Sequence, residues 1–298
     1  MVYCVECFIF TPLKIFMIVY PNCKINIGLR ILDKRSDGYH NIETICVPIS
    51  WHDILEVLPC SELIFSYQGL TISGKSDQNL CVKAFQLLQK DYPQQVKGAY
   101  IHLHKRIPMG AGLGGGSADA AYALVALNKL YHLQLNTSDL LKYAQLLGSD
   151  VPLFLHNTAQ FCYEKGEKTR SINLFIPYPI IVIYPAIYSD TRLAYQSIIY
   201  QNHEGKSLLN DITTLPIEKW REYIHNDFEV SVGKEYAQII EVKNKMYAYG
   251  ALYASMSGSG SAVYGIFQDL KSIKKIIREI PKEYLYHIQM KGYINSCS

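Results

Sequence analysis

The sequence has few cysteines, little net charge and no long hydrophobic run, and each shortage excludes a class of protein. Eight cysteines are scattered over 298 residues, unlike the dense cysteines of a secreted disulfide-bonded domain, so we expect a cytoplasmic location. The net charge of +3 is too small to indicate nucleic-acid binding. The apolar stretch at 2–20 is interrupted by Glu6, Pro12 and Lys14, so it falls short of the roughly 20 residues of a membrane span. We therefore expect neither a nucleic acid nor a membrane as a partner.

Clusters of metal ligands are missing as well. Cys4-x-x-Cys7 is the only close cysteine pair, and neither a second CxxC nor a His-x₃₋₅-His is present to complete a structural zinc site. His102 and His104 share one face of an expected strand, but no third ligand accompanies them, which favours a structural role. We predict no metal held by protein ligands alone and assign the cysteine pair no function.

What the sequence does have is apolar material for a packed core, in two domains or one large one. Hydrophobic residues make up 49% and charged residues 18%, which excludes disorder for the chain as a whole. The hydrophobic pattern alternates between strand and helix periods and resets past residue 160, which places a boundary at about 160–175. We predict strands at 25–32, 42–57, 63–67, 70–72, 99–103, 180–184, 262–267 and 284–289, and helices at 79–92, 117–133, 137–147, 190–200, 228–248 and 269–279.

Two glycine-rich segments compete as the phosphate-binding loop. Residues 69–76 fit the Walker pattern G-x-x-x-x-G-K-[ST] in full. However, Leu70, Thr71 and Ile72 favour an extended strand over a sharp turn, and Asp77 is a natural helix N-cap. A Walker match needs its strand–loop–helix context, so we interpret these glycines as turn residues. A P-loop nucleoside triphosphatase stays as an alternative.

The second segment reads PMGAGLGGGSADAA from Pro108 to Ala121, and five of its residues 110–116 are glycine. Ordering so many glycines is costly, and their missing side chains let the backbone approach an anion. A helix follows directly, so its free N–H groups and its dipole would face a phosphate. Gly110-x-Gly112-x-x-Gly115 also fits the dinucleotide fingerprint, but Pro108 interrupts the turn that it needs. The expected nucleotide-binding residues here are Pro108, Gly110, Gly112, Leu113, Gly114, Gly115, Gly116, Ser117 and Asp119.

This segment resembles the ATP loop of the GHMP kinase superfamily. Two further blocks match in the expected order: PNCKINIGL at 21–29, and MSGSGSA at 256–262, which is similar to the third, glycine-rich motif of these kinases. The resemblance adds Ser257, Gly258, Ser259 and Gly260 to the nucleotide-binding set and implies ATP as co-substrate with Mg²⁺.

Finer features resemble one branch of that superfamily, the 4-diphosphocytidyl-2-C-methyl-D-erythritol kinases. They are RSDGYH at 35–40, LGSDVPLF at 147–154 and NDFE at 226–229. The resemblance begins at Met17 and implies an extension at 1–16, an N-terminal ATP-binding domain at 17–165 and a C-terminal domain at 166–298. The implied fold is the two-domain α/β and α+β GHMP-kinase fold: a ribosomal-protein-S5-like ATP domain, a ferredoxin-like domain, and the active site in the cleft between them.

The implied reaction is ATP-dependent phosphorylation of the 2-hydroxyl of 4-(cytidine 5'-diphospho)-2-C-methyl-D-erythritol in the non-mevalonate route to isoprenoid precursors. Asp150 would accept the hydroxyl proton, since a carboxylate suits that task. Lys24 would keep the Asp150 carboxylate ionised. Without the resemblance, Asp150 would be a turn residue and Lys24 an ordinary strand lysine. The implied substrate-binding residues are Asn26, Tyr39, His40, Thr191 and Tyr195, with the rings of Tyr39 and Tyr195 on the two faces of the cytosine.

Two departures from the family pattern stand out. Cys23 replaces the usual alanine before Lys24, a small-for-small exchange, and Ala118 replaces a serine, which removes one hydroxyl from the loop. Another GHMP small-molecule kinase, acting on mevalonate, homoserine or galactose, and a catalytically silent nucleotide sensor are the alternatives. We expect a monomer or a weak homodimer.

Overall fold

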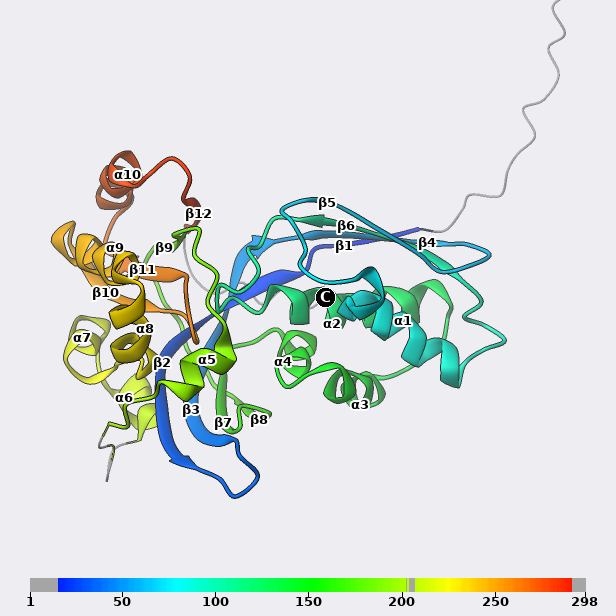
Figure 1. The fold of residues 1–298 in the computed structure, drawn as a ribbon, viewed down its shortest axis with the longest axis horizontal. Coiled ribbons are helices and arrows are strands. Elements are labelled where there is room, and N and C mark those ends of the chain that lie inside the picture. Colours follow the sequence, from blue (N-terminus) through cyan, green and yellow to red (C-terminus); the bar gives the residue numbers. More distant parts are fainter. Residues whose placement is uncertain (1–15, 202, 204–206, 291–298) are drawn as a thin grey trace, which may run out of the picture.

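The computed structural model describes residues 16–201, 203 and 207–290. Its first element, β1, begins at Met17, and almost all of the expected extension, with Cys4 and Cys7, lies outside the described residues. Three four-stranded sheets organise the chain (Figure 1). No helix in the described part has both the length and the apolar character needed to cross a membrane.

The first sheet forms a layer with helices on one side. Its strands are β1 (Met17–Val19), β4 (Ile54–Pro59), β6 (Ala99–Lys105) and β5 (Ile64–Gly69), in that order, and only β5 and β6 run parallel. The helices are α1 (Leu80–Asp91), α2 (Gly115–Leu130), α3 (Thr137–Leu147) and α4 (Val151–His156). Five alanines of α2 are buried, namely Ala118, Ala120, Ala121, Ala123 and Ala126. Because alanine is small, these positions let α1 and the sheet approach the helix closely.

The second sheet connects the two halves of the molecule. Strands β2 (Asn22–Lys34), β3 (His40–His52), β7 (Gln160–Glu164) and β8 (Lys168–Ser171) pair antiparallel in that order. The long β2–β3 hairpin crosses the molecule from the helical layer to the C-terminal half (Figure 1). Its register shifts at Gly28, where φ is +63°. Such a bulge bends a strand and re-aims the side chains beside it, and Lys24 and Asn26 lie just before it on β2.

The third sheet has the topology of a split β-α-β motif. Its order is β10 (Ala251–Met256), β11 (Val263–Phe267), β9 (Ile180–Tyr184) and β12 (Leu285–Gln289), all antiparallel. In chain order this is β9, a helical segment, β10, β11, α10 (Leu270–Glu279) and β12, the ferredoxin-like pattern. Ile180 and Val182 pack toward β2 and β3, whereas Ile181 and Ile183 pack toward α9 (Ala237–Ala248) and α10. Alternate side chains of β9 therefore join two separate cores.

The remaining helices link β9 to β10. They are α5 (Thr191–Gln196), α6 (Leu208–Thr214), α7 (Trp220–Tyr223) and α8 (Phe228–Glu235). A 3₁₀ turn at Ile217–Lys219 precedes α7, and another at Ser76–Gln78 precedes α1. The expected helix at 228–248 is wrong as a single element, because it breaks into α8 and α9 at Tyr236.

Other expectations at the element level have mixed outcomes. The strand at 180–184 and the helix at 137–147 are confirmed at both ends. The strand at 70–72 is wrong, since β5 ends at Gly69 and an irregular segment follows. Asp77 is not the N-cap of α1; Asn79 is, and its side-chain oxygen accepts from the Cys81 N–H at 2.9 Å. The predicted domain boundary after residue 165 falls in the turn between β7 and β8, which are paired strands of one sheet.

Candidate active site

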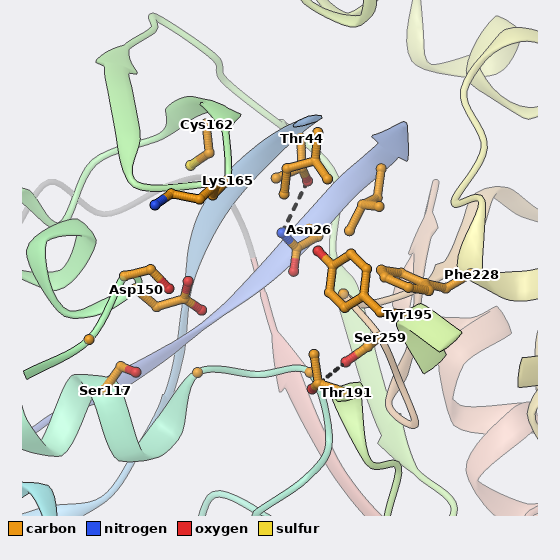
Figure 2. A pocket seen from close by; sticks show the side chains of 18 of the residues that line it. Asn26, Thr44, Ser117, Asp150, Cys162, Lys165, Thr191, Tyr195, Phe228 and Ser259 are labelled. Carbon is orange, nitrogen blue, oxygen red and sulfur yellow. Dashed lines mark hydrogen bonds between the residues drawn. The ribbon is translucent and has the colours of Figure 1, made fainter. Parts of the chain in front are cut away.

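A cavity of about 1260 Å³ lies where the helical layer, the β2–β3 hairpin and the C-terminal half meet. Single small-ligand pockets usually measure about 300–1,000 Å³, so this one has room for two small molecules. Figure 2 shows Ser117 and Asp150 on one side of it, Asn26 and Thr44 at the centre, and Tyr195 and Thr191 on the other side. Of the predicted site residues, the lining includes Lys24, Asn26, Tyr39, His40, Pro108, Gly110, Gly112, Leu113, Gly114, Gly115, Gly116, Ser117, Asp150, Thr191, Tyr195, Gly258 and Ser259.

The glycine loop borders the cavity in a conformation that depends on glycine. Gly112 has φ of +72°, and a Cβ there would stand 1.9 Å from the carbonyl oxygen of Ser257. Gly114 is the N-cap of α2 at φ of +69°, a left-handed geometry that costs other residues about 1–2 kcal/mol. Because α2 begins at Gly115 and residues 114–117 line the cavity, the first turn of a long helix is directed at it. This geometry suits a phosphate group.

Neighbouring elements hold the loop by its carbonyl oxygens. The oxygen of Leu113 accepts from the Lys24 N–H at 3.0 Å, and that of Ala111 accepts from the Ala262 N–H at 3.0 Å. The oxygen of Gly112 accepts from Lys24 Nζ at 2.8 Å and from Ser257 Oγ at 2.9 Å. The loop is thus anchored to both halves of the molecule, and its shape is set before any ligand binds.

Lys24 and Asn26 form a buried pair at the centre of the cavity. Lys24 Nζ donates to Asn26 Oδ1 as well as to the loop, and Asn26 Nδ2 donates to Thr44 Oγ1 at 3.0 Å. The ion pairs among the described residues do not include one between Lys24 and Asp150. An ammonium group has three donors, so the two contacts described here leave one N–H for a ligand.

Asp150 stands at the turn between α3 and α4, where it is half-buried and makes no capping hydrogen bond. Its side chain lines the cavity on the same side as Ser117 (Figure 2). Burial and the charge of Asp150 raise the pKa of Tyr195 to about 12, so that phenol stays protonated at neutral pH.

Aromatic side chains line the cavity on the side opposite Ser117 and Asp150 (Figure 2). Tyr195 stacks on His40 with ring centroids 5.1 Å apart and meets Phe228 edge-on at 4.9 Å. His40 Nε2 lies 3.0 Å from the Tyr200 hydroxyl, and burial with the charge of Lys34 lowers the pKa of His40, so its ring is neutral at pH 7. Tyr39 is 61% exposed. Tyr39 and Tyr195 thus do not form a ready slot for a base, because Tyr195 packs on His40.

The loop that contains Ser257, Gly258, Ser259 and Gly260 divides by function. Ser257 is fully buried, and its hydroxyl accepts from the Asn26 N–H at 3.1 Å while it donates to the glycine loop. Ser257 and Gly260 do not line the cavity, whereas Gly258 and Ser259 do. Thr191 Oγ1 and Ser259 Oγ lie 2.8 Å apart (Figure 2). This part of the expected nucleotide set is therefore half structural scaffold and half cavity wall.

The NDFE block at 226–229 supports that loop from behind. Asn226 Nδ2 donates to the carbonyl oxygens of Met256 and Gly258 at 2.9 and 2.8 Å, and Glu229 Oε1 accepts from the Met256 N–H at 2.7 Å. The motif thus shapes the loop, and of its residues only Phe228 reaches the cavity.

Asp119 is, with Ser257 and Gly260, a predicted site residue that does not line the cavity. Its carboxylate is buried and accepts from Lys105 Nζ at 2.7 Å, and Lys105 also donates to Asp53 Oδ2 at 2.5 Å. None of the three lines the cavity. Sequence reasoning missed Lys105 and Asp53, which stand outside every motif; the only signal was their charge in otherwise apolar, core-forming segments.

His102 and His104 make side-chain contacts with the neighbouring strand. Their Nδ1 atoms lie 2.7 Å from Ser66 Oγ and 2.9 Å from Gln68 Nε2 on the neighbouring strand β5. Within the described ranges, no group of three or more His, Cys, Asp or Glu side chains could hold a metal ion.

Comparison with known proteins places this geometry in a family. The model of the GHMP kinases N terminal domain matches residues 79–158, and that of the GHMP kinases C terminal domain matches 214–287. A 4-diphosphocytidyl-2-C-methyl-D-erythritol kinase of Cytophaga hutchinsonii is 44% identical over 254 residues, which cover 84% of this chain and 92% of the relative. One of Bacteroides fragilis is 41% identical over 265 residues, covering 87% and 95%.

Solved structures agree with these matches. A crystal structure of 4-(cytidine 5'-diphospho)-2C-methyl-D-erythritol kinase superposes with a TM-score of 0.76 at 30% identity, covering 93% of this chain and all of that one. The Methanococcus jannaschii mevalonate kinase superposes with a TM-score of 0.67 at 14% identity, covering 94% and 99%, which shows the fold alone. The expected GHMP-kinase fold is confirmed. The chain belongs to the GHMP kinase superfamily and, within it, to the family of 4-diphosphocytidyl-2-C-methyl-D-erythritol kinases.

Proposed function

We propose that this protein transfers the γ-phosphate of ATP to the 2-hydroxyl of 4-(cytidine 5'-diphospho)-2-C-methyl-D-erythritol. The observation that carries the proposal is one cavity lined by the glycine loop at the start of α2, by His40 and aromatic rings, and by Lys24 and Asp150. Phosphoryl transfer asks a protein chiefly for positioning and charge neutralisation, and these features can supply both.

The triphosphate lies along the glycine loop and the first turn of α2 in this proposal. The N–H groups of residues 114–117 and the dipole of α2 stabilise the phosphate charge. Gly258 and Ser259 close on the triphosphate from the C-terminal half. Lys24, held by the Gly112 oxygen and Asn26, points its remaining N–H at the transferring group.

Asp150 takes the proton of the substrate 2-hydroxyl. As that oxygen bonds to the γ-phosphorus, the bond from phosphorus to the bridging oxygen breaks and ADP leaves. A general base contributes about 10²–10⁴-fold to a rate. Lys24 neutralises charge that develops on the attacking oxygen, although its amine does not pair with Asp150 directly.

The cytidine lies at the aromatic end. The exposed ring of Tyr39 offers a stacking face, and neutral His40 can donate or accept a hydrogen bond at the base edge. Asn26 and Thr191 are the polar groups nearest the methylerythritol. We also predicted that Tyr195 covers the second face of the base. This stays a prediction, because the Tyr195 ring stacks on His40 in the structure.

ATP is the co-substrate that the family uses, and we propose that Mg²⁺ accompanies it. Mg²⁺ prefers oxygen ligands and keeps water and phosphate oxygens in its shell. The Ser117 hydroxyl is an oxygen donor on the cavity lining in the first turn of α2. With phosphate oxygens and water it would hold the ion, which would neutralise phosphate charge there. A cytoplasmic location and a monomer or weak homodimer complete the proposal.

A coupled ADP-release assay tests the substrate. We expect turnover with the cytidine-linked substrate and none with galactose, homoserine or mevalonate. Turnover on one of these alcohols instead would replace the substrate within the same superfamily. ATP binding without turnover on any of them would indicate a nucleotide sensor.

Replacing Asp150 by Asn tests the base. The substitution keeps the size and removes the proton acceptor, so kcat should fall by about 10²–10⁴-fold while the Kd for ATP, measured calorimetrically, changes little. Asp139→Asn is the matched control, because Asp139 lies in the neighbouring helix α3 and pairs with exposed Lys142. Near-normal turnover of Asp150→Asn would remove the base assignment.

A further inference from the structure

Three charged side chains lie buried behind the glycine loop, outside the cavity. Asp53 sits between β3 and β4, Lys105 ends β6, and Asp119 lies on α2; they are 0%, 2% and 3% exposed. Lys105 Nζ bridges the two carboxylates at 2.5 and 2.7 Å. We call these three residues the buried triad.

The buried triad connects the elements on either side of the loop. Asp53 Oδ1 accepts from the backbone N–H groups of Arg106 and Ile107, which lead directly into Pro108. The Asp53 N–H donates to the Pro21 oxygen at 2.9 Å, at the link between β1 and β2. Asp119 brings in α2. Strand β6, the start of the loop and the helix after it are therefore joined through a single ammonium group.

The contact with the loop is close. A Cβ at Gly115, the first residue of α2, would stand 3.0 Å from Lys105 Nζ. The absence of a side chain there lets the helix start rest against the amine. Lys105 and the Ile107 side chain, whose Cγ2 would stand 2.8 Å from the same Cβ, thus limit how closely the first turn of α2 approaches the sheet.

The arrangement is poorly explained by stability alone. Buried ion pairs often stabilise no more than apolar side chains of the same volume, because removing charges from water is costly. With two carboxylates and one ammonium the buried triad is unbalanced, and Asp119 Oδ1 has no hydrogen-bond partner in the described part of the chain. Burial, with Asp53 nearby, raises the pKa of Asp119 to about 7. A group kept at such a cost, directly behind a phosphate loop, points to a role in the site.

We propose that Lys105 is a positioning residue for the nucleotide, with Asp53 and Asp119 as its anchors. It fixes the position of the glycine loop and the first turn of α2 so that their N–H groups can donate to the phosphates. The inference rests on the proposed binding of ATP to this loop. It assigns Asp119 to the support of the loop rather than to a phosphate or Mg²⁺.

Two variants at Asp119 and one at Lys105 test this. Asp119→Leu removes the acceptor at similar volume, and we expect the calorimetric Kd and the KM for ATP to rise at least tenfold while the KM for the cytidine-linked substrate stays constant. Asp119→Asn keeps an oxygen for Lys105 and should recover most of that loss. Lys105→Arg keeps the charge, but its wider head group must displace the helix start at Gly115, so it should also weaken ATP binding if Asp119→Leu does not fold.

The control is Asp211→Leu, which breaks the 2.6 Å ion pair with Arg30 away from the cavity. It should lower the Tm and leave the Kd for ATP unchanged. If the Asp119 and Lys105 variants behave like this control, with a lower Tm and an unchanged Kd, the buried triad is only structural and the proposal is overturned. If the wild-type protein itself does not bind ATP, the proposed nucleotide site fails first, and this inference falls with it.

Discussion

At the scale of single residues, the glycines of the loop serve different purposes, although they form one run in the sequence. Gly112 is required by its backbone and by the Ser257 oxygen, which a Cβ would meet at 1.9 Å. Gly116 is different, because it is helical, its φ is not in the left-handed region, and nothing lies within 4 Å of an added Cβ. Gly116 lines the cavity, so an added Cβ would occupy open space there.

A pair of alanine substitutions separates these purposes. Gly112→Ala should lower the free energy of unfolding by about 2–4 kcal/mol through strain and collision. Gly116→Ala should leave it unchanged or raise it by about 0.5–1 kcal/mol, since alanine favours helix, yet raise the KM for ATP several-fold. Urea unfolding and steady-state kinetics on both variants check this. An unchanged KM in Gly116→Ala would mean that phosphate does not approach this turn.

Asp119 illustrates what residue patterns could not predict. The sequence predicts a helix start at 117, which would place Asp119 in the first turn beside a phosphate. The helix begins at Gly115, because Gly114 takes the left-handed N-cap conformation. Asp119 then lies one turn above Gly115, on the side of the sheet. A shift of two residues at a helix start, which glycine allows and hydrophobic periodicity does not register, changes the role of a carboxylate.

At the scale of elements, most periodic segments were predictable and several short ones were not. Strand β9, with five residues, is an exception, because all five are hydrophobic. Helix α3 has an apolar period, the N-cap Asn136 and a glycine after its end, and it was predicted to the residue. Strands β7, β8 and β10 and helix α4 were missed. These segments have six residues or fewer, too few to show a period. Their partners decide them: β7 exists because it pairs with β3.

The catalytic candidates depend on those missed elements. Asp150 stands at the start of α4, and in the sequence it reads as part of a polar turn. Only the resemblance to the family made Asp150 and Lys24 candidates, because the two residues come from a turn and a strand that the fold brings to one cavity.

The Walker-like segment allows a test at this scale. The structure gives it a strand, a loop and a helix, so the predicted strand at 70–72 was the wrong reason to dismiss it. The better reason is location: from residues 69–80 only Leu80 lines the cavity, and Lys75 does not. Gly69 is required by the Lys105 oxygen, which a Cβ would meet at 2.3 Å. Lys75→Ala should therefore change the calorimetric Kd for ATP by less than about twofold. A tenfold loss of ATP affinity would indicate that residues 69–76 are the phosphate-binding loop after all.

At the scale of the whole molecule, the cavity depends on how the C-terminal sheet packs on the β2–β3 hairpin. Strands β9 and β11 contribute Val182, Tyr264 and Ile266 to a core shared with Ile25 and Val47 of the hairpin. The same packing brings the loop of residues 257–260 against the glycine loop. The order of strands in each sheet follows from which faces are apolar, but the contact between sheets joins residues more than 200 positions apart, which no local pattern reports.

One polar contact at that junction is sensitive to pH. His287 of β12 stacks on Trp51 of β3 with centroids 5.8 Å apart, and its Nε2 lies 3.0 Å from Ser50 Oγ. Burial, with the positive charges of His52 and Arg106 nearby, lowers the pKa of His287 to about 4. In the unfolded chain the His287 imidazole takes up a proton near its ordinary pKa of about 6.5. In the folded protein it is protonated only when the pH falls to about 4.

The free energy of unfolding should therefore fall as the pH drops from about 6.5 towards 4, because the unfolded state binds the extra proton throughout that window. Between pH 7 and pH 5 the loss due to His287 is on the order of 1 kcal/mol, since solvent screens a half-buried ring. His287→Phe keeps a ring on Trp51 and cannot be protonated, so its urea-unfolding free energy should lose less over the same interval. His225→Gln, at an exposed position, should keep the wild-type dependence. If His287→Phe loses stability between pH 7 and pH 5 as steeply as wild type, acid sensitivity does not arise at the junction, and other groups set it.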